Sequence, residues 1–410
     1  MAPAEREDGY LPAVRTAIFV VSGATAGQRG PVAALVSTAG WAAAAGRVLD
    51  AAWIATPTGV MEPSEARRSG SAPHLTSETA PRWPRVLPLT AKVAVKDALQ
   101  WRRGRRAAIG SCGPWTGSDV AFVWQRHEMF NTGGIDLARA LDVPSVLFVT
   151  APQVWEAERW GVRRPGWGRA LERWGERPAL LAADLVACGT EIVAEQAVRL
   201  GVQAERVLIT PTGVDLDVFT GRVGDGGLRR QLGLEGRFVV GWVGSFRRFH
   251  ALESAVEAVA RIDGASLLLV GDGPERPRIE RLAADRGAHA VFAGTVPHAE
   301  LPLHLAVMDV ALVVTSPSQS FHYSPLKLAE YLAAGLPVVA PVTGQLAERL
   351  VDGVDAVLVP PGDLSALVAG LVRLRDDPEL RQRLGRRARR LAEDSWSWDL
   401  QVRRLLGALA

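Results

Sequence analysis

The stretch SPLKLAEYLAAGLPVV, from Ser324 to Val339, decides the fold of the chain. Ser324 is a residue type that caps helices and Pro325 suits the first helical position, so a helix is expected to begin here. A buried strand is expected at 337–340, directly after this helix. A helix that begins after a strand and a turn presents free backbone N–H groups and the positive end of its dipole. The stretch therefore predicts an anion site that would suit a diphosphate.

Two side chains on this helix carry the candidate chemistry. Lys327 falls in the first turn, where a cation opposes the helix dipole, and it is one of three lysines in a chain that otherwise uses arginine. A bound phosphate would offset this repulsion; the alternative is an ordinary exposed lysine. Glu330 lies further along the helix, where a carboxylate could accept two ribose hydroxyls, the alternative being a surface glutamate.

Strands and helices alternate on both sides of this stretch. The alternation predicts parallel sheets and hence two doubly wound α/β domains in tandem. Residues 58–85 are rich in Ser, Pro, Arg and Thr without periodicity, and are expected to form a loop. Strands are expected at 15–22, 50–56, 119–125, 144–149, 183–188 and 206–210, and again at 237–243, 265–270, 290–293, 309–314, 337–340 and 356–359.

The length of the chain agrees with this division, because 410 residues at about 150 per domain give two or three domains. We expect a Rossmann-like N-terminal domain at 1–210, a linker at 211–235 and a Rossmann-like C-terminal domain at 236–394. Ligands of such sheets bind outside the carboxyl ends of the strands. Two domains that face one another would enclose a cleft there.

Composition excludes several other classes of protein. With 48% hydrophobic and 22% charged residues, the chain is neither disordered nor fibrous. It has no run of 18 apolar residues and no secretory signal pattern, and Cys112 and Cys188 cannot form a disulfide framework, so a reduced, cytoplasmic protein is expected. The net charge of +3 comes from an arginine-rich composition typical of a GC-rich genome. No nucleic-acid-binding motif occurs, and nucleic acid is not an expected partner.

An ordered set of motifs in the second half resembles retaining glycosyltransferases of family four, which have the GT-B fold. The resemblance implies two Rossmann-like domains that face one another across a cleft, with a nucleoside diphosphate sugar held mainly by the C-terminal domain. It also implies that residues 395–410 form a helix that crosses back to the N-terminal domain. The motifs are GWVGS at 241–245, VGDGPE at 270–275, GTVP at 294–297, MDV at 308–310, the stretch at 324–339, DG at 352–353 and VPPG at 359–362.

The resemblance also implies roles for individual residues at the donor site. Glu330 corresponds to the second glutamate of a Glu-x7-Glu motif and is expected on the ribose, but the first position is His322 here, which leaves the sugar open. Backbone amides from Tyr323 to Lys327 would hold phosphate or sugar. The donor-binding residues expected on this basis are Gly27, Gly30, Gly244, Ser245, Arg248, Val296, His322, Tyr323, Ser324, Pro325, Leu326 and Glu330.

The expected catalytic residues are His127, Arg247 and Lys327. Relatives have a basic pair after the first strand of the second domain; here Ser245 replaces one arginine, while Arg247 and Arg248 can supply guanidinium groups to a diphosphate. One of the two arginines is expected to pair with a surface acid instead. His127 follows an expected strand at the place where relatives have a histidine that faces the sugar, and a structural histidine is the alternative.

The sequence has no HExxH motif, no Cys/His cluster and no convincing Asp-x-Asp motif, so a reaction without metal or other cofactor is expected. The charge of the leaving group would then be neutralised by Arg247, Arg248, Lys327 and helix N–H groups. The resemblance implies retention of the anomeric configuration. A front-face mechanism, in which the leaving phosphate accepts the proton of the acceptor, fits these residues better than double displacement by two carboxylates. An oxidoreductase is disfavoured, because no GxGxxG follows the first strand.

Four tryptophans mark the expected acceptor side within residues 151–178. Trp155 and Trp160 are the candidate acceptor-binding residues, with Trp167 and Trp174 at similar spacing. The four could form an aromatic wall for a small ring-bearing acceptor, or could pack against the core or a partner subunit. The expected partners are therefore a small-molecule acceptor and a UDP- or GDP-sugar, with a homodimer left open.

We expect transfer to a small soluble acceptor in natural-product or small-thiol biosynthesis, with attack by oxygen, nitrogen or sulfur left open. Two alternatives remain. A lipid or glycan glycosyltransferase at a membrane surface would use the basic cluster at 101–106. A non-catalytic partner subunit that binds a nucleotide sugar is suggested by His322 and Ser245.

Overall fold

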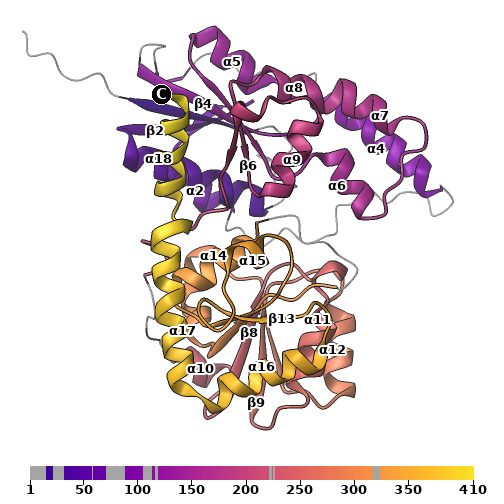
Figure 1. Ribbon diagram of the computed structural model, residues 1–410, viewed down its shortest axis with the longest axis vertical. Coiled ribbons are helices and arrows are strands. Elements are labelled where there is room, and N and C mark those ends of the chain that lie inside the picture. The colour runs from indigo at the N-terminus through magenta and orange to yellow at the C-terminus, as the bar shows by residue number, and fades with distance from the viewer. Residues whose placement is uncertain are drawn as a thin grey trace, which may run out of the picture.

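The computed structural model describes residues 15–21, 32–57, 59–70, 88–104, 113–115, 119–220, 224, 227–316 and 324–410. These residues form two α/β domains, each built on its own sheet, which lie one above the other in Figure 1. The predicted class of two Rossmann-like sheets is confirmed.

The first domain contains a seven-stranded sheet in which neighbouring strands are parallel, except that β3 is antiparallel to β2. Its inner strands are runs of apolar, largely β-branched and aromatic residues that are buried on both faces, as parallel sheets covered by helices require. In sheet order the strands are β3 (Gly59–Met61), β2 (Ala51–Thr56), β1 (Thr16–Val20), β4 (Val120–Arg126), β5 (Ser145–Val149), β6 (Leu185–Cys188) and β7 (Val207–Ile209).

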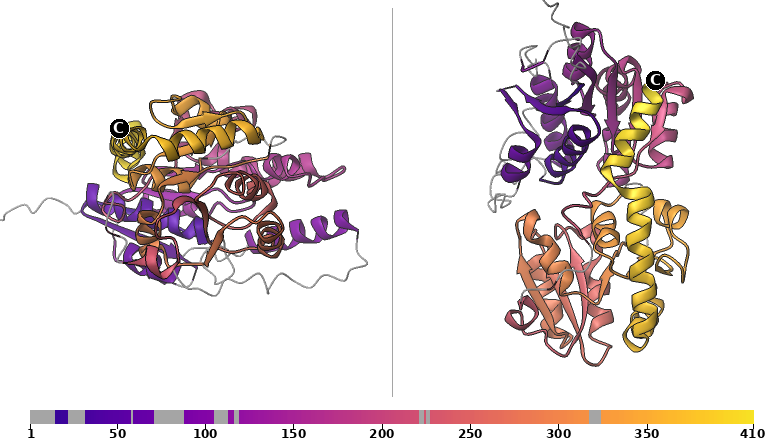
Figure 2. Two further views of the ribbon diagram at one scale, coloured as in Figure 1. Left: turned by 90° about the horizontal axis from the view of Figure 1, so that it is seen from below. Right: turned by 90° about the vertical axis from the view of Figure 1, so that its left-hand side faces the viewer.

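Helices cover both faces of this sheet (Figures 1 and 2). The segments α7 and α8 are joined into one continuous helix by a π-helical turn, η3. The helices are α2 (Val32–Val48), α3 (Pro63–Gly70), α4 (Leu89–Gly104), α5 (Gly133–Leu141), α6 (Gln153–Arg159), α7 (Gly168–Leu171), η3 (Glu172–Glu176), α8 (Arg177–Ala182), α9 (Glu191–Arg199) and the 3-10 turn η4 (Ala204–Arg206).

The expectation of a loop throughout 58–85 is wrong for its first part, where β3 and α3 lie. β3 is an edge strand of three residues, too short to show an alternating pattern. Pro63 begins α3 and Glu65 lies in its first turn, both common helix-start signals, and Ala66 is buried against the first core. With eight residues and little apolar beyond Ala66, the sequence PSEARRSG is easily taken for a polar loop.

The second domain contains a six-stranded, fully parallel sheet. Its central strand β8 is buried between two hydrophobic clusters, one on each face of the sheet. In sheet order the strands are β10 (Ala290–Gly294), β9 (Ala265–Val270), β8 (Phe238–Val243), β11 (Val310–Leu312), β12 (Val338–Pro341) and β13 (Val357–Val359).

The helices of the second domain follow its strands in alternation, and α14 and α15 lie on the side that faces the first domain (Figure 1). The bounds are α10 (Leu228–Gln231), η5 (Arg248–His250), α11 (Leu252–Val259), α12 (Arg276–Asp285), η6 (His298–Glu300), α13 (Leu301–Ala306), α14 (Leu326–Ala333), α15 (Gly344–Arg349), α16 (Leu364–Asp376), α17 (Pro378–Leu391), the π-helical turn η7 (Ala392–Trp396) and α18 (Trp398–Leu409).

The C-terminal helices connect the two domains. α17 packs on α14 in the second domain, and α18 packs on α2 in the first, so the yellow ribbon runs along both domains in Figure 2. Trp398 fills the junction, with its ring centroid 5.2 Å from that of Trp41 in the first core. The ring leaves no room for a side chain at Gly40 or Gly213, because a Cβ there would lie 2.4 or 2.6 Å from it.

The backbone crosses between the domains twice at one place. The amide of Val214 donates to the carbonyl of Trp396 at 2.7 Å, and the amide of Trp398 donates to the carbonyl of Val214 at 3.1 Å. Val214 and Ser397 therefore form an isolated parallel bridge. Arg47 of α2 bonds to Asp399 of α18 beside it, at 2.6 Å.

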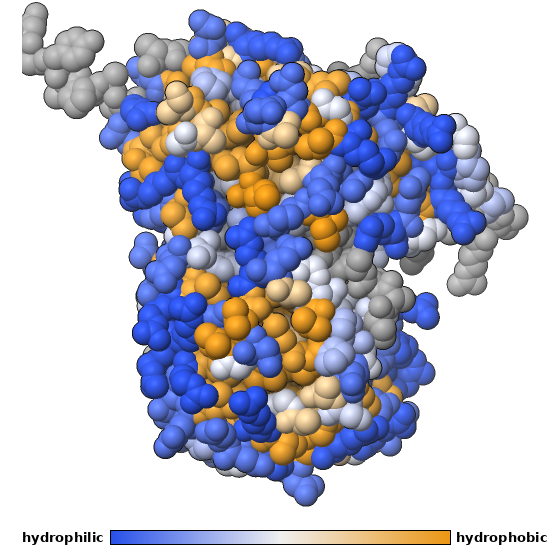
Figure 3. All heavy atoms as spheres, in the orientation of Figure 1, coloured by the Kyte–Doolittle hydropathy of each residue, from blue (hydrophilic) through white to orange (hydrophobic). Residues whose placement is uncertain are grey.

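Each domain has its own hydrophobic core. Figure 3 shows one face of the molecule, on which hydrophobic residues gather on each domain and a hydrophilic band lies between them. Among the described residues, no helix combines the length and the apolar character that crossing a membrane requires.

Candidate functional site

Helix α14 is fixed at the face of the second domain that meets the first. The hydroxyl of Tyr331 accepts a hydrogen bond from the amide of Val243, at the end of β8, at 2.8 Å. Ser324 does not cap the helix as predicted: its hydroxyl accepts from the amide of Thr212, and its carbonyl accepts from the Thr212 hydroxyl, both at 3.0 Å. Pro325 is the residue before the first turn, without a side-chain cap. The start of α14 is thus tied to the interdomain linker, and its first amides keep their capacity to bind an anion.

Lys327 lies in this first turn, with its ammonium nitrogen 4.0 Å from the centre of the Trp242 ring. No carboxylate among the described residues forms an ion pair with it. Gly244 makes room for it: a Cβ there would lie 2.9 Å from the Lys327 nitrogen, and the φ of Gly244 is +146°. The predicted glycine and lysine are therefore in direct proximity, at the end of β8.

The electrostatics of this place favour an anion. Burial lowers the pKa of Lys327 to about 7, against an opposing effect of the Glu330 charge. Burial and the charges of Lys327 and Arg247 lower the pKa of His250 to about 2. Both pKa values are lowered mainly by burial, and a bound anion would raise them again by favouring the charged forms.

Arg247 and Arg248 are exposed next to this position, in the segment between β8 and α11. Neither guanidinium group forms an ion pair or hydrogen bond within the described part of the chain, so the expectation that one of them pairs with a surface acid is wrong. Ser245 is also exposed, and its carbonyl accepts from the amide of Arg247 at 2.8 Å. The two arginines remain available to a ligand.

Glu330 is buried on α14, one turn beyond Lys327, at 4% exposure. Its Oε1 lies 2.8 Å from Nε2 of His298, the first residue of η6. Val296, which precedes His298 by two residues, packs against the edge of the core. The segment of Val296, a predicted donor-binding residue, and the predicted ribose carboxylate therefore meet through His298, which the sequence patterns did not single out.

Four predicted donor residues, Gly27, Gly30, His322 and Tyr323, lie outside the described residues. Leu326 packs partly against the core of the first domain. The structure thus brings together Gly244, Lys327 and Glu330 directly, with Ser245, Arg247, Arg248, Ser324 and Pro325 on the adjoining segments.

His127 lies on the first domain, directly after β4, and is buried at 4% exposure. Its Nε2 is 3.5 Å from Oε1 of Glu176, a carboxylate with no exposed surface. The same oxygen accepts hydrogen bonds from the amides of Gln153 and Val154, at the start of α6. Glu176 ends the π-helical turn η3, a type of helical irregularity that is frequent at functional sites. This carboxylate thus holds His127 and the N-terminus of α6 together.

The four tryptophans of the expected acceptor wall each contact a different part of the molecule. Trp155 packs against the first-domain core under the guanidinium of Arg159. The ring of Trp160 lies 4.6 Å from that of Phe249 in the second domain. Trp174 is 64% exposed. The contact of Trp160 places α6 next to the segment that carries the two arginines.

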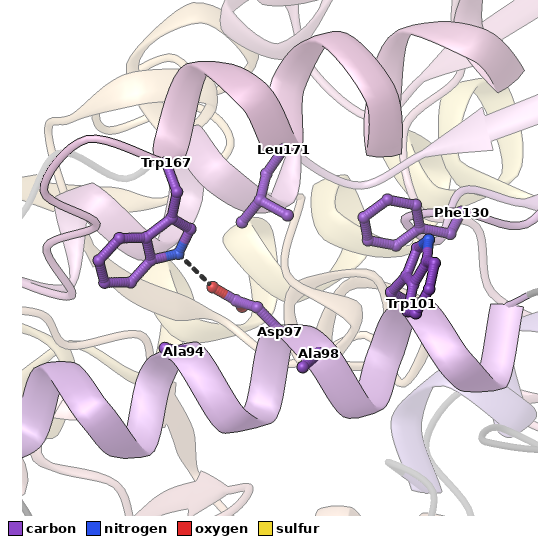
Figure 4. Close-up of a pocket in the computed structure, with 7 residues that line it drawn as sticks. All are labelled: Ala94, Asp97, Ala98, Trp101, Phe130, Trp167 and Leu171. Atoms are coloured by element: carbon purple, nitrogen blue, oxygen red, sulfur yellow. Dashed lines mark hydrogen bonds between the residues drawn. The ribbon is translucent and has the colours of Figure 1, made fainter.

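Trp167 lines a cavity of about 330 Å³ between α4 and α7 (Figure 4). Its indole N–H donates to Asp97 at 2.9 Å, and Arg164 donates to both oxygens of the same carboxylate at 2.9 and 3.1 Å. The polar groups that Asp97 offers are thus already bonded, and the rest of the lining is apolar: Ala94, Ala98, Trp101, Phe130 and Leu171.

Sequence reasoning missed His250, His298 and Glu176. His250 had a signal, because it belongs to the same short segment as Arg247 and Arg248. The roles of His298 and Glu176 depend on contacts across 32 and 49 residues of sequence, which no local pattern shows. Within the described residues, no group of three His, Cys, Asp or Glu side chains could hold a metal ion.

The residues at the start of α14 are suited to bind a phosphorylated ligand in one orientation. The helix amides, Lys327 and the two arginines lie at one end, and the Glu330 carboxylate lies one turn away. Three residues of helix rise by about 4.5 Å, which separates a cationic position from an acceptor of hydroxyl hydrogen bonds. This arrangement matches the order of phosphate and ribose in a nucleoside diphosphate.

Residues 237–377 match the family described as Glycosyl transferases group 1. The chain is 30% identical over 218 residues to 2-deoxystreptamine glucosyltransferase of Streptomyces kanamyceticus, covering 51% of this chain and 54% of that one. It is 33% identical over 259 residues to D-inositol 3-phosphate glycosyltransferase of Thermomonospora curvata, covering 58% and 59%. The matched part thus spans between a half and three fifths of these curated relatives.

Two solved structures resemble nearly the whole chain. Alr3699/HepE of Anabaena in complex with UDP matches with a TM-score of 0.64 at 17% identity, over 96% of this chain and 99% of that one. Sucrose-phosphate synthase of Thermosynechococcus elongatus matches with a TM-score of 0.63 at 21% identity, over 95% and 98%. These likenesses show a shared fold.

Proposed function

Because residues 237–377 match the group 1 glycosyl transferases and the chain shares the fold of two Rossmann-like domains with its structural neighbours, we propose that it is a glycosyltransferase that transfers a sugar from a nucleoside diphosphate sugar to a small, water-soluble acceptor, with retention of anomeric configuration. The observation that carries the proposal is the joint placement of Lys327, Gly244 and Glu330 at the start of α14. Lys327 contacts the ring of Trp242 and forms no ion pair with a carboxylate of the described residues, and we place the diphosphate of the donor at its ammonium group.

In this proposal the second domain binds the donor. The amides at the start of α14, Lys327 and the pair Arg247 and Arg248 hold the diphosphate, and Glu330 accepts the ribose hydroxyls. The positive groups neutralise the charge that develops on the leaving diphosphate, without involvement of a metal ion.

The chemical step exchanges one bond at the anomeric carbon for another. The bond from that carbon to the diphosphate oxygen breaks, and a bond to the acceptor heteroatom forms on the same face of the sugar. The acceptor proton passes to the leaving phosphate oxygen, so that charge and protons balance. His127, held by Glu176 on the opposite domain, positions the transferred sugar.

The acceptor class is proposed from the relatives, two of which are named for action on 2-deoxystreptamine and on inositol 3-phosphate. Both are small, hydroxyl-rich ring compounds. Natural-product or small-thiol biosynthesis is the corresponding setting, and Trp155 and Trp160 on α6 stay the proposed acceptor-side residues.

Thermal unfolding with UDP, GDP, ADP and dTDP, each with and without EDTA, tests the donor site. A nucleotide at a hundredfold its Kd adds about 2.7 kcal/mol to the free energy of unfolding. The proposal expects stabilisation by one of them that persists in EDTA, and then hydrolysis or transfer from the matching sugar nucleotide. Binding without any turnover would instead favour a non-catalytic subunit, and no binding at all would reject the donor site.

A further inference from the structure

A histidine outside the proposed donor residues holds the carboxylate of Glu330. Nε2 of His298 lies 2.8 Å from Oε1 of Glu330. The Glu330 side chain is 5% exposed and that of His298 is 29% exposed. A carboxylate so far removed from water depends on protein donors for its hydrogen bonds, and His298 is such a donor.

The orientation of His298 is set from its other side by the interdomain linker. The ring of Phe219 meets the imidazole edge to face, with centroids 5.6 Å apart and planes at 71°. Phe219 is itself 1% exposed, and its amide donates to the carbonyl of Asp215 at 3.1 Å. The imidazole is thus confined between a fixed aromatic ring and the carboxylate. The ring therefore loses little rotational freedom when it donates to Glu330.

We propose that His298 is a positioning residue that orients Glu330 toward the donor ribose, and that it thereby sets the preference for ribonucleotides over 2′-deoxyribonucleotides. The inference rests on the proposed function and deepens it. Each oxygen of a carboxylate can accept two hydrogen bonds. With one of these four positions filled by His298, both oxygens of Glu330 keep capacity for the two neighbouring ribose hydroxyls.

The position of His298 also joins two parts of the nucleoside site. It lies two residues after Val296, in the segment that follows β10, while Glu330 lies on α14 one turn beyond Lys327. The segment that follows β10 and the carboxylate on α14 are therefore linked through the hydrogen bond of His298.

The test is calorimetric titration of the intact chain with UDP and 2′-deoxy-UDP, and with the guanosine pair if UDP does not bind. The variants are His298→Ala, His298→Gln, Glu330→Ala and the double alanine variant. His289→Ala is the matched control, because this exposed histidine of the same domain bonds to Ser266 at 2.9 Å, away from α14. Thermal unfolding of each variant checks that it is folded.

We expect His298→Ala to weaken binding of the ribonucleotide about tenfold and that of the 2′-deoxy analogue less than about twofold, since the lost hydrogen bond serves the hydroxyls. His298→Gln, whose amide can still donate, should retain most of the preference. In the Glu330→Ala background the His298 substitution should have no further effect, because one residue acts through the other.

Equal weakening of both nucleotides by His298→Ala would reduce His298 to a structural role. A full effect of His298→Ala in the Glu330→Ala background would show that it does not act through the carboxylate. If the unsubstituted chain binds a nucleotide with ribose preference and His298→Ala preserves that preference, the inference alone fails. If the unsubstituted chain binds none of UDP, GDP, ADP and dTDP, the proposed function fails with it.

Discussion

The ammonium nitrogen of Lys327 lies 4.0 Å from the centre of the Trp242 ring, one turn before Glu330 on the same helix. The aromatic face gives the half-buried cation partial compensation for its reduced contact with water. The contact keeps the lysine extended over the end of β8, where Gly244 leaves space for it. An anionic ligand that binds here would form an ion pair with Lys327, for which no carboxylate of the described residues is in place.

Nucleotide binding should therefore be accompanied by uptake of a proton. The pKa of Lys327 is lowered to about 7, so the neutral lysine gains over the charged form as the pH rises above this value. A diphosphate favours the charged form and raises this pKa, so affinity should fall as the pH rises above about 7. Calorimetry at pH 8 in two buffers of different ionisation enthalpy measures the uptake. Lys327→Met should abolish it, and an unchanged uptake in that variant would assign the proton to another group.

Glu330→Ala should weaken nucleotide binding by about 1–3 kcal/mol, because a buried acceptor of ribose hydrogen bonds is removed. Calorimetric titration with the nucleotide that stabilises the chain measures the change. Glu379→Ala on α17 is the control, as this exposed carboxylate lies in the first turn of another helix. Equal affinities in the two variants would rule out contact between Glu330 and the ribose.

Substitution of both Arg247 and Arg248 by alanine should weaken donor binding and reduce its dependence on salt, since two exposed positive charges near the diphosphate are lost. The measurement is nucleotide affinity at several ionic strengths. Arg278→Ala serves as control, because Arg278 already bonds to Glu275 at 2.8 Å and also to Glu253. An identical salt dependence in the double variant and the control would mean that the pair does not contact the diphosphate.

Glu176→Ala should lower the free energy of unfolding by about 1–3 kcal/mol, because buried donors lose their acceptor. Those donors are the amides of Gln153 and Val154 and the imidazole of His127. Glu176→Gln keeps an accepting oxygen and should lose less stability. Urea denaturation compares both with Glu172→Ala, a partly exposed residue of the same turn. Equal stability of all three variants would contradict the bridging role of Glu176.

Trp398→Ala should cost about 3–5 kcal/mol of stability, as expected for removal of a large buried aromatic side chain. Its ring packs against Trp41 and against the backbone at Gly40 and Gly213. Trp174→Ala, at a position that is 64% exposed, should change stability by less than about 0.5 kcal/mol. Urea denaturation of the two variants gives the comparison, and similar midpoints would show that the junction is not anchored by Trp398.

The sequence was sufficient to predict both sheets, because each inner strand is a continuous apolar run bounded by turn residues. It also assigned Lys327 and Gly244 to one expected donor site, because both lie in motifs that resemble one family. It could not predict the partner of Ser324. A serine before a helix usually caps it, but here Thr212, more than a hundred residues earlier, takes its hydrogen bonds.

Long-range contacts explain the remaining differences. His298 and Glu330, like His127 and Glu176, become neighbours only when separate elements pack together. The elements β3 and α3 are short, and α3 is largely polar, so neither stands out from a loop in the sequence. Local patterns therefore located the helix that carries the site, while the residues that orient its side chains come from the tertiary structure.

The pairing of Val214 with Ser397 has a mechanical consequence. Both passages of the chain between the domains run side by side through this one pairing, with Trp398 wedged next to it. A change in the relative orientation of the domains would therefore have to bend both passages together at Val214 and Ser397, because backbone hydrogen bonds tie each passage to the other.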